Sequence, residues 1–205
     1  MIEIILDNIN NSEVNVADLP ITKIEWIEVC PLFEEDFYNT LMEMPNDKRA
    51  ELLVEKMNDD RIVQMLFSKF GTFGLRSNVI RSIYAFGQTH GIGYTLKPHV
   101  DSYPRVFNMV FHFAEDDNTP EAGTAVYDIK NFDTKEYETY ATANYLRNSC
   151  TILCLNTHSW HGVDMLMKDI KRDSVVLVFS AEEWNENQMH YADWKPGVTV
   201  NYEKV

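Results

Sequence analysis

The hydrophobic pattern of this chain changes period partway along, and this change constrains the fold more than any other feature. Between residues 31 and 70, apolar residues recur at three- and four-residue spacing, as in PLFEEDFYNTLMEM and DDRIVQMLFSKF, which predicts helices. Beyond Gly74 the period falls to two, and turn-rich segments such as GQTHGIG interrupt it. Helices followed by short strands predict a mainly β domain, a sandwich or barrel braced by N-terminal helices, with a ligand pocket at its mouth.

Several segments carry the strand pattern. They are residues 79–86, 94–101, 105–113, 123–129, 150–156 and 173–181. Residues 1–7 are expected to form an opening strand, and Asn46-Asp47 and Asp59-Asp60 are the expected N-caps of two helices. The 205 residues contain no repeat or linker, so we expect one domain over 1–205, with helical support at about 31–70 and the β core at about 79–181.

Composition excludes several classes of protein. A hydrophobic content of 45% argues against disorder, and the longest apolar run, SVVLVF, is too short to span a membrane. Cys30, Cys150 and Cys154 follow no zinc or redox spacing, which indicates a reducing, cytoplasmic setting. The formal net charge of −14 argues against nucleic acid as the main partner. The sequence leaves the oligomeric state open.

Polar residues interrupt the strand pattern in LKPHVDSYPRVFNMVFHF. His99 and Asp101 are separated by one residue, so on a strand their side chains share a face. They could form a structural hydrogen-bonded pair, but an imidazole beside a carboxylate also suits a divalent metal. A third ligand is available at His158 or His161, after the strand CTILCLN. Two histidines and one carboxylate form the facial triad of non-haem Fe(II) oxygenases.

An arginine and a serine open the next apolar strand, in KRDSVVLVF. Arg172 and Ser174 share a face by alternation. A buried guanidinium requires an anion, and a guanidinium beside a hydroxyl is well matched to a carboxylate. The alternative is that Arg172 pairs with Asp169 or Asp173 at the end of the strand.

These motifs together resemble those of the Fe(II)/2-oxoglutarate-dependent dioxygenases, particularly small prolyl-hydroxylase-like members. The matching residues are the HxD at His99-Val100-Asp101, the distal histidine in Trp160-His161-Gly162-Val163, and the RxS at Arg172-Asp173-Ser174. The 62-residue step from His99 to His161 and the eleven-residue step to Arg172 are similar to the family's spacing. The resemblance covers about residues 84–179.

The resemblance implies a double-stranded β-helix, or cupin-like jelly roll, that uses Fe(II), 2-oxoglutarate and dioxygen. His99, Asp101 and His161 would be the metal ligands, and Arg172 and Ser174 would hold the far carboxylate of 2-oxoglutarate. Tyr84, or else Tyr94, would assist them, and Asn108 would line the same pocket. The expected activity is hydroxylation of an amino-acid side chain, free or in a peptide, so the expected partner is a small-molecule or peptide substrate.

Two other functions remain open. A cupin-like iron enzyme could work without 2-oxoglutarate, with Arg172 binding a substrate carboxylate directly, or a catalytically inactive jelly roll could only bind a ligand. His112 alternates with apolar neighbours and is interpreted as a core or surface histidine. The tail MHYADWKPGVTVNYEKV could be a final strand, a pocket lid or a contact surface.

Overall fold

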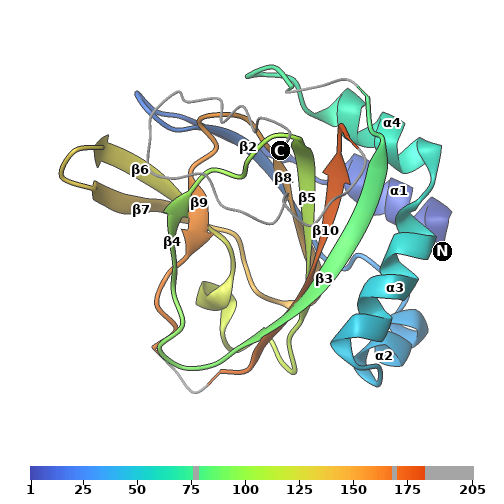
Figure 1. The fold of residues 1–205 in the computed structure, drawn as a ribbon. Coiled ribbons are helices and arrows are strands. Elements are labelled where there is room, and N and C mark those ends of the chain that lie inside the picture. The colour runs from blue at the N-terminus through green and yellow to red at the C-terminus, as the bar shows by residue number, and fades with distance from the viewer. Residues whose placement is uncertain (76–78, 168–169, 183–205) are drawn as a thin grey trace, which may run out of the picture.

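Two antiparallel sheets and a layer of helices make up the fold in the computed structural model, which describes residues 1–75, 79–167 and 170–182 (Figure 1). The larger sheet has the strand order β1-β2-β8-β5-β10-β3 and the smaller one the order β4-β9-β6-β7. Each paired strand runs antiparallel to its neighbour. The prediction of a mainly β chain with N-terminal helices is confirmed.

The strands of the larger sheet are β1 (Val14–Asp18), β2 (Lys23–Val29), β3 (Ser82–His90), β5 (Arg105–Phe113), β8 (Arg147–Cys154) and β10 (Arg172–Ser180). Those of the smaller sheet are β4 (Leu96–His99), β6 (Ala125–Asn131), β7 (Glu136–Thr142) and β9 (His161–Val163). The helices are α1 (Ile2–Asn11), α2 (Glu35–Met42), α3 (Asn46–Met57) and α4 (Asp60–Lys69), with a short 3-10 turn at Pro120–Ala122.

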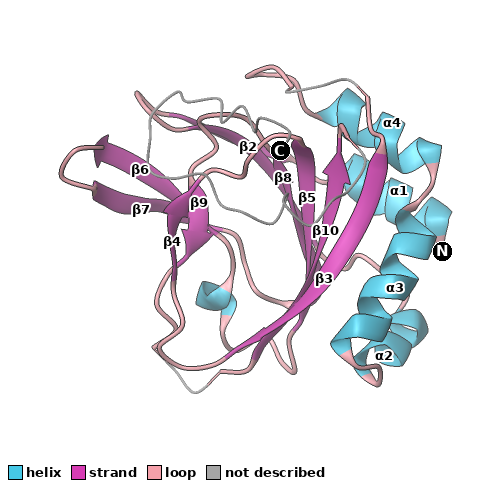
Figure 2. Ribbon diagram, in the orientation of Figure 1, coloured by secondary structure: helices cyan, strands magenta, loops and turns pink. Residues whose placement is uncertain are grey.

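The helices cover one face of the larger sheet, and the smaller sheet lies across its other face (Figure 2). Alternation along β5 and β10 sends one set of side chains to the helices, where they join the main hydrophobic core: Phe107, Met109, Phe111, Phe113, Val175, Leu177 and Phe179. The other set, which includes Asn108, His112 and Arg172, points toward the smaller sheet. The fold therefore places polar residues of buried strands between the two sheets.

Some local predictions need correction. Residues 1–7 form most of α1 and not a strand, because Ile5 and Ile9, four residues apart, are both buried against the main core. Asp59 caps α4, its side chain accepting a hydrogen bond from the backbone of Arg61, as predicted. Asn46, however, is the first residue of α3, and Pro45 precedes it as the cap.

Four strands lacked a clear sequence signal. They are β1, β2, β7 and β9. β2 is buried on both faces and does not alternate, β7 is exposed along most of its length, and β9 has three residues. The C-terminal tail, residues 189–205, lies outside the described residues. Within the described part of the chain, no helix is long and apolar enough to cross a membrane.

Candidate active site

Two histidines lie side by side on adjacent strands of the smaller sheet. His99 is the last residue of β4 and His161 the first residue of β9, and the antiparallel register pairs them directly. Asp101 follows two residues after His99, beyond the end of β4. Nε2 of His99 lies 3.9 Å from Oδ1 of Asp101. Nε2 of His161 lies 3.5 Å from Oδ2 of the same carboxylate. The three side chains are buried, and their ligand atoms all lie within 4.8 Å of one another.

Gly162 permits this close approach of β4 and β9. A Cβ atom at this position would lie 2.2 Å from the backbone oxygen of Leu96 and 3.0 Å from the ring of Tyr127. The first distance is far below van der Waals separation and the second is tighter than an ordinary contact, so a side chain here would push β9 away from β4. The glycine of the WHGV motif thus sets the distance between His99 and His161.

Backbone carbonyls orient both imidazoles. Nδ1 of His99 lies 3.0 Å from the oxygen of Lys97, and Nδ1 of His161 lies 2.7 Å from the oxygen of Ser159. A carbonyl can only accept a hydrogen bond, so each Nδ1 carries the proton and each Nε2 presents a lone pair. Burial and the neighbouring His161 lower the pKa of His99 to about 4. His99 is therefore neutral at neutral pH, the state in which an imidazole binds a metal.

Two donors hold the carboxylate of Asp101. Nη1 of Arg105 donates to Oδ1 at 2.9 Å, and Nδ2 of Asn108 donates to Oδ2. Burial by itself would raise the pKa of Asp101, but the positive charge of Arg105 holds it well below its usual range. Asp101 is therefore an ionised carboxylate that two donors hold in place beside the neutral His99.

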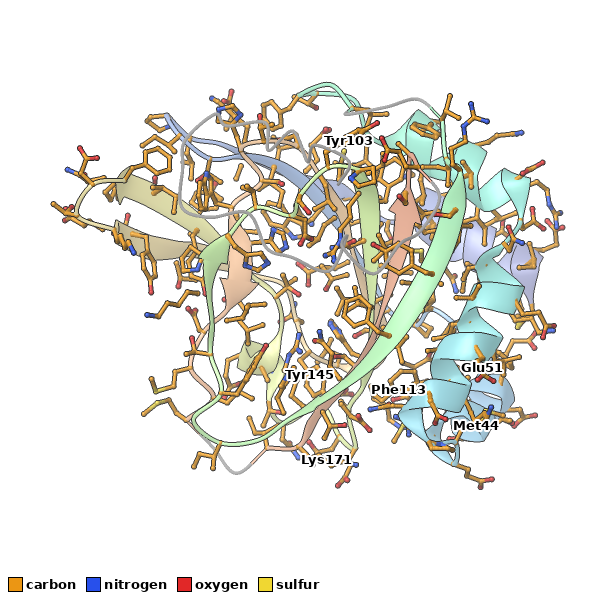
Figure 3. All side chains as sticks on the ribbon, viewed as in Figure 1. Met44, Glu51, Tyr103, Phe113, Tyr145 and Lys171 are labelled. Carbon is orange, nitrogen blue, oxygen red and sulfur yellow. The ribbon has the colours of Figure 1, made fainter. Side chains whose placement is uncertain are left out.

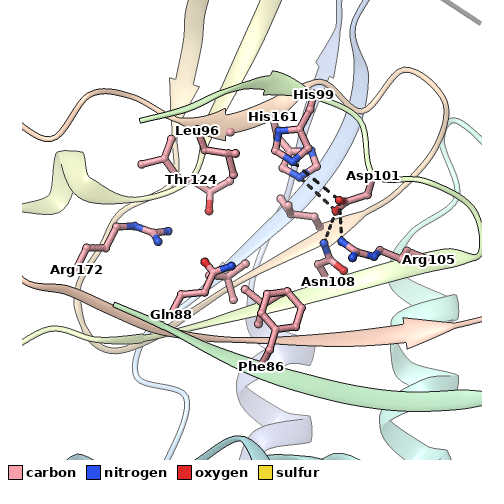
Figure 4. Close-up of a pocket in the computed structure, with 15 residues that line it drawn as sticks. Phe86, Gln88, Leu96, His99, Asp101, Arg105, Asn108, Thr124, His161 and Arg172 are labelled. Atoms are coloured by element: carbon pink, nitrogen blue, oxygen red, sulfur yellow. Dashed lines mark hydrogen bonds and ion pairs between the residues drawn. The ribbon is translucent and has the colours of Figure 1, made fainter. Parts of the chain in front are cut away.

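The three residues open into a pocket between the sheets (Figure 4). Its walls combine six apolar residues and one glycine with eight polar or charged residues. The lining residues are Phe86, Gln88, Leu96, His99, Asp101, Arg105, Asn108, Val110, Thr124, Leu153, His161, Gly162, Val163, Arg172 and Val176. Arg172 lies across the pocket from the His-Asp-His cluster, with Gln88 and Thr124 between them in the view.

Arg172 is buried at 2% exposure on the inner face of β10. Its Nε donates to the backbone oxygen of Ala122 at 2.6 Å, and its Nη1 donates to Oγ of Ser174 at 3.3 Å. No carboxylate among the described residues pairs with it. Asp173, a predicted alternative partner, faces the helices and pairs with Arg49 at 2.8 Å, and Asp169, the other one, lies outside the described residues.

The structure corrects the assignment of Tyr84. On β3, Tyr84 pairs with Val178 of β10, whereas Arg172 pairs with His90. Six strand positions separate the two sites, a distance of about 20 Å, so Tyr84 cannot contact the same carboxylate as Arg172. Tyr84 instead lies near Arg105 at the metal-ligand end of the pocket, where burial raises its pKa. Tyr94, the alternative, stacks on His90 at the Arg172 end.

Two of the other predicted residues lie at the site, and one lies away from it. Asn108 lines the pocket as expected, and Ser174 contacts Arg172. His158 is exposed in the loop before β9, where Nδ1 contacts the hydroxyl of Thr157, so it does not join the cluster. Sequence reasoning missed Arg105, although an arginine opening a buried strand is the same signal that identified Arg172.

Three buried polar atoms on the inner face of the larger sheet provide a test of whether a polar ligand fits. Oδ1 of Asn108, Nε2 of His112 and Oγ1 of Thr151 have no hydrogen-bond partner among the residues that the structure describes. Buried polar groups are nearly always satisfied, so such atoms call for water or a ligand. The buried charge of Arg172, which no carboxylate of the described residues pairs, fits the carboxylate of an anionic molecule bound in the pocket.

Comparisons with known proteins show the fold. No protein-family model matches the chain, and no curated protein matches its sequence. A prolyl-4-hydroxylase from Pseudomonas putida superposes with a TM-score of 0.51 at 12% identity, covering 90% of this chain and 95% of that one. HygX from Streptomyces hygroscopicus, solved with nickel and 2-oxoglutarate bound, gives 0.51 at 10% identity, covering 78% of this chain and 84% of that one. The predicted jelly roll is therefore confirmed, and the resemblance to the 2-oxoglutarate oxygenases extends to the fold.

Proposed function

We propose that this protein is a single-domain Fe(II)- and 2-oxoglutarate-dependent dioxygenase that hydroxylates an amino-acid or peptidyl side chain. One observation carries the proposal: a single pocket has a buried His-Asp-His cluster at one end and, at the other, a buried arginine that no carboxylate of the described residues neutralises. A ligand that chelates a metal through one end and presents a carboxylate at the other would satisfy both.

His99, Asp101 and His161 are the proposed metal ligands. Two imidazole nitrogens and one carboxylate oxygen would occupy one face of the ion and leave the opposite positions for cosubstrate and dioxygen. Closed zinc sites use four protein ligands and often thiolates, and none of the three cysteines belongs to this cluster. Bound iron would supply the dioxygen activation that couples oxidative decarboxylation of 2-oxoglutarate to hydroxylation of a C–H bond.

The side chains of the pocket bind and orient. Arg172 and Ser174 would donate hydrogen bonds to the far carboxylate of 2-oxoglutarate. Arg105 and Asn108 fix Asp101, so that the carboxylate ligand does not rotate when the ion binds. Val110, Val176 and the other apolar residues of the walls exclude water from the reacting centre.

The compared structures support this function and its substrate class. HygX was solved with 2-oxoglutarate bound, and the Pseudomonas putida structure is that of a prolyl-4-hydroxylase. We infer an amino-acid or peptide substrate from this likeness. None of the three cysteines forms a disulfide within the described residues, which supports our proposal of a reducing, cytoplasmic setting.

Succinate production tests the proposed function. Purified protein, incubated with Fe(II), ascorbate, oxygen and 2-oxoglutarate, should form succinate, and formation should increase with a suitable amino acid or peptide from a substrate panel. His99→Ala should abolish it, whereas His158→Gln, which changes an exposed loop histidine, should leave it unchanged. An iron-loaded protein that forms no succinate across the panel would favour the cupin-like alternative.

A further inference from the structure

His112 is a buried polar residue to which the proposed function gives no role. It lies on the inner face of β5, and the antiparallel register places it directly opposite Ser174 of β10. Side chains directly opposite each other in an antiparallel pair have Cβ atoms about 5 Å apart. His112 therefore lies beside the Arg172–Ser174 pair and not, as the sequence pattern indicates, among apolar neighbours alone.

The ring of Tyr145 lies near both His112 and Arg172. Its ring centroid lies 5.2 Å from that of the His112 imidazole and 5.9 Å from the guanidinium carbon of Arg172. Figure 3 shows Tyr145 at the end of the molecule where Lys171, the residue before Arg172, is labelled. Burial, followed by the positive charge of Arg172, lowers the pKa of His112 to about 3. The imidazole is therefore neutral at neutral pH.

The two ring nitrogens of His112 have different surroundings. Nδ1 lies 3.0 Å from Oγ of Ser149, which is on β8, on the opposite side of β5 from Arg172. Nε2 is buried and has no hydrogen-bond partner within the described part of the chain. A buried ring nitrogen without a partner is destabilising, so it is expected to be satisfied when a ligand is bound.

Ser149 can serve either tautomer of the ring. Its hydroxyl accepts from the backbone N–H of Leu146 and donates to the backbone oxygen of that residue at 2.8 Å. If the hydroxyl turns from that oxygen and donates to Nδ1 of His112 instead, the proton of the neutral imidazole lies on Nε2, which becomes a donor. The position of this donor beside Arg172 suits a carboxylate oxygen.

We propose that Nε2 of His112 donates a hydrogen bond to the far carboxylate of 2-oxoglutarate, and that Ser149 holds the imidazole in the tautomer that makes this possible. The proposal rests on the proposed function. It assigns three donors to that carboxylate: the guanidinium of Arg172, the hydroxyl of Ser174 and the imidazole of His112. Two of these donors are uncharged, so the site would bind the anion with one positive charge.

Two substitutions of His112 separate the roles of its nitrogens. In His112→Gln the amide nitrogen lies near the position of Nε2 and keeps a donor toward the carboxylate. In His112→Asn the amide group lies near the position of Nδ1, so contact with Ser149 is kept and the donor toward the carboxylate is lost. His158→Gln, in the exposed loop, is the control.

The measurement compares two 2-oxo acids on Fe(II)-loaded protein without oxygen. 2-Oxoglutarate and 2-oxopentanoate chelate a metal through the same atoms, but 2-oxopentanoate lacks the far carboxylate. The dissociation constant of each is obtained from the visible charge-transfer band. His112→Asn should weaken 2-oxoglutarate binding about tenfold or more, and His112→Gln by much less, because a hydrogen bond to a charged group is lost only in the former. Binding of 2-oxopentanoate should be unchanged in both variants.

Three results would overturn the assignment. The first is that His112→Asn binds 2-oxoglutarate with wild-type affinity. The second is that His112→Asn binds both 2-oxo acids more weakly to the same degree, which indicates a structural effect. The third is that His112→Gln fails to retain 2-oxoglutarate binding. If His112→Asn does not fold, Ser149→Ala takes its place and should weaken only 2-oxoglutarate binding. A wild-type protein that binds iron but gives no band with 2-oxoglutarate would instead contradict the proposed function itself.

Discussion

Asp101 has both of its carboxylate oxygens engaged before any metal binds. Arg105 donates to one oxygen and Asn108 to the other, and both donors come from the first residues of β5. This strand also carries His112, so one strand connects the proposed metal ligand to the proposed carboxylate site. Such supporting hydrogen bonds keep a ligand in the orientation that the metal requires.

Replacing Asn108 with leucine should weaken metal binding. The substitution removes the donor to Oδ2 of Asp101 and frees the carboxylate to rotate, so we expect a tenfold to hundredfold loss of Fe(II) affinity, about the effect of losing a supporting hydrogen bond. Anaerobic competition with a chromophoric chelator measures this affinity. Asn39→Leu, on the exposed surface of α2, is the control. Unchanged Fe(II) affinity in folded Asn108→Leu would show that Asn108 does not support Asp101.

His112 should also make the protein sensitive to acid. Its pKa is about 3 in the folded protein, below the ordinary histidine value of 6.5, so between these pH values the unfolded chain binds one more proton. The free energy of unfolding therefore falls as the pH drops below about 6.5, by up to about 1.4 kcal/mol per pH unit for this residue. Urea unfolding of wild type and His112→Gln at pH 5 and pH 7 measures the difference. Equal pH dependence in both proteins would show that His112 is protonated in the folded state.

At the scale of elements, the contact of β4 with β9 brings the two histidines together. Gly162→Ala would place a Cβ atom 2.2 Å from the backbone of Leu96, and backbone cannot move away as a flexible side chain can. We expect a loss of about 2 kcal/mol or more in the free energy of unfolding, together with weaker Fe(II) binding. Gly91→Ala is the matched control, because nothing lies within 4 Å of its Cβ position. Similar stabilities of the two variants in urea would contradict this account.

A buried ion pair joins the helices to β10. Arg49 of α3 lies 2.8 Å from Asp173, which also accepts hydrogen bonds from Asn46 and Thr89. The backbone of Asp173 is held from the other side by the hydroxyl of Tyr145. These contacts fix the chain next to Arg172, so the helical layer positions the end of the strand that carries it.

Breaking this pair from one side should be strongly destabilising. Arg49→Met removes the buried cation of Asp173 and leaves the carboxylate with the largely exposed Lys171, whose Nζ lies 3.5 Å from it, so we expect a loss of about 3 kcal/mol in the free energy of unfolding. Urea unfolding of Arg49→Met, Asp173→Asn and the double variant gives the coupling energy. Strictly additive losses would mean that the two side chains do not interact.

Much of this arrangement could be predicted from the sequence, for identifiable physical reasons. The buried strands β5 and β10 have long apolar runs, and the helices α2 to α4 have a clear three-to-four residue period. Residues 1–7 were assigned the wrong period because Ile2, Ile4 and Leu6 alternate over a window too short to include Ile9. β9 has three residues, so its pairing with β4 depends on tertiary contacts that no local pattern contains.

In the site, too, some residues can be predicted from local sequence patterns and others depend on how the strands pair. His99, Asp101, His161 and Arg172 could be singled out because charged or ionisable side chains in apolar strands are costly to bury. Tyr84 was placed wrongly because its distance from Arg172 depends on the register between β3 and β10, which sequence spacing does not give. The sequence pattern around His112 indicates only a core or surface histidine, because its surroundings become polar only when β5 pairs with both β8 and β10.

At the scale of the whole molecule, an acidic chain encloses a cationic pocket. The formal net charge is −14, yet Arg105 and Arg172 are both buried between the sheets. The larger sheet contributes both arginines and Asn108, and the smaller sheet contributes His99 and His161. The proposed site is therefore complete only when the two sheets pack together, which links binding of the metal and the cosubstrate to the integrity of the whole fold.

The most direct test of the account is an anaerobic titration of the Fe(II)-loaded protein with 2-oxoglutarate. Wild type should develop a saturable visible charge-transfer band, because the 2-oxo acid chelates iron held by His99, Asp101 and His161. Arg172→Met should require at least tenfold more 2-oxoglutarate, since the charged partner of the far carboxylate is lost, whereas Arg61→Met, on the exposed surface of α4, should match wild type. An iron-loaded wild type without a band, or an Arg172→Met variant that binds 2-oxoglutarate as wild type does, would contradict the account.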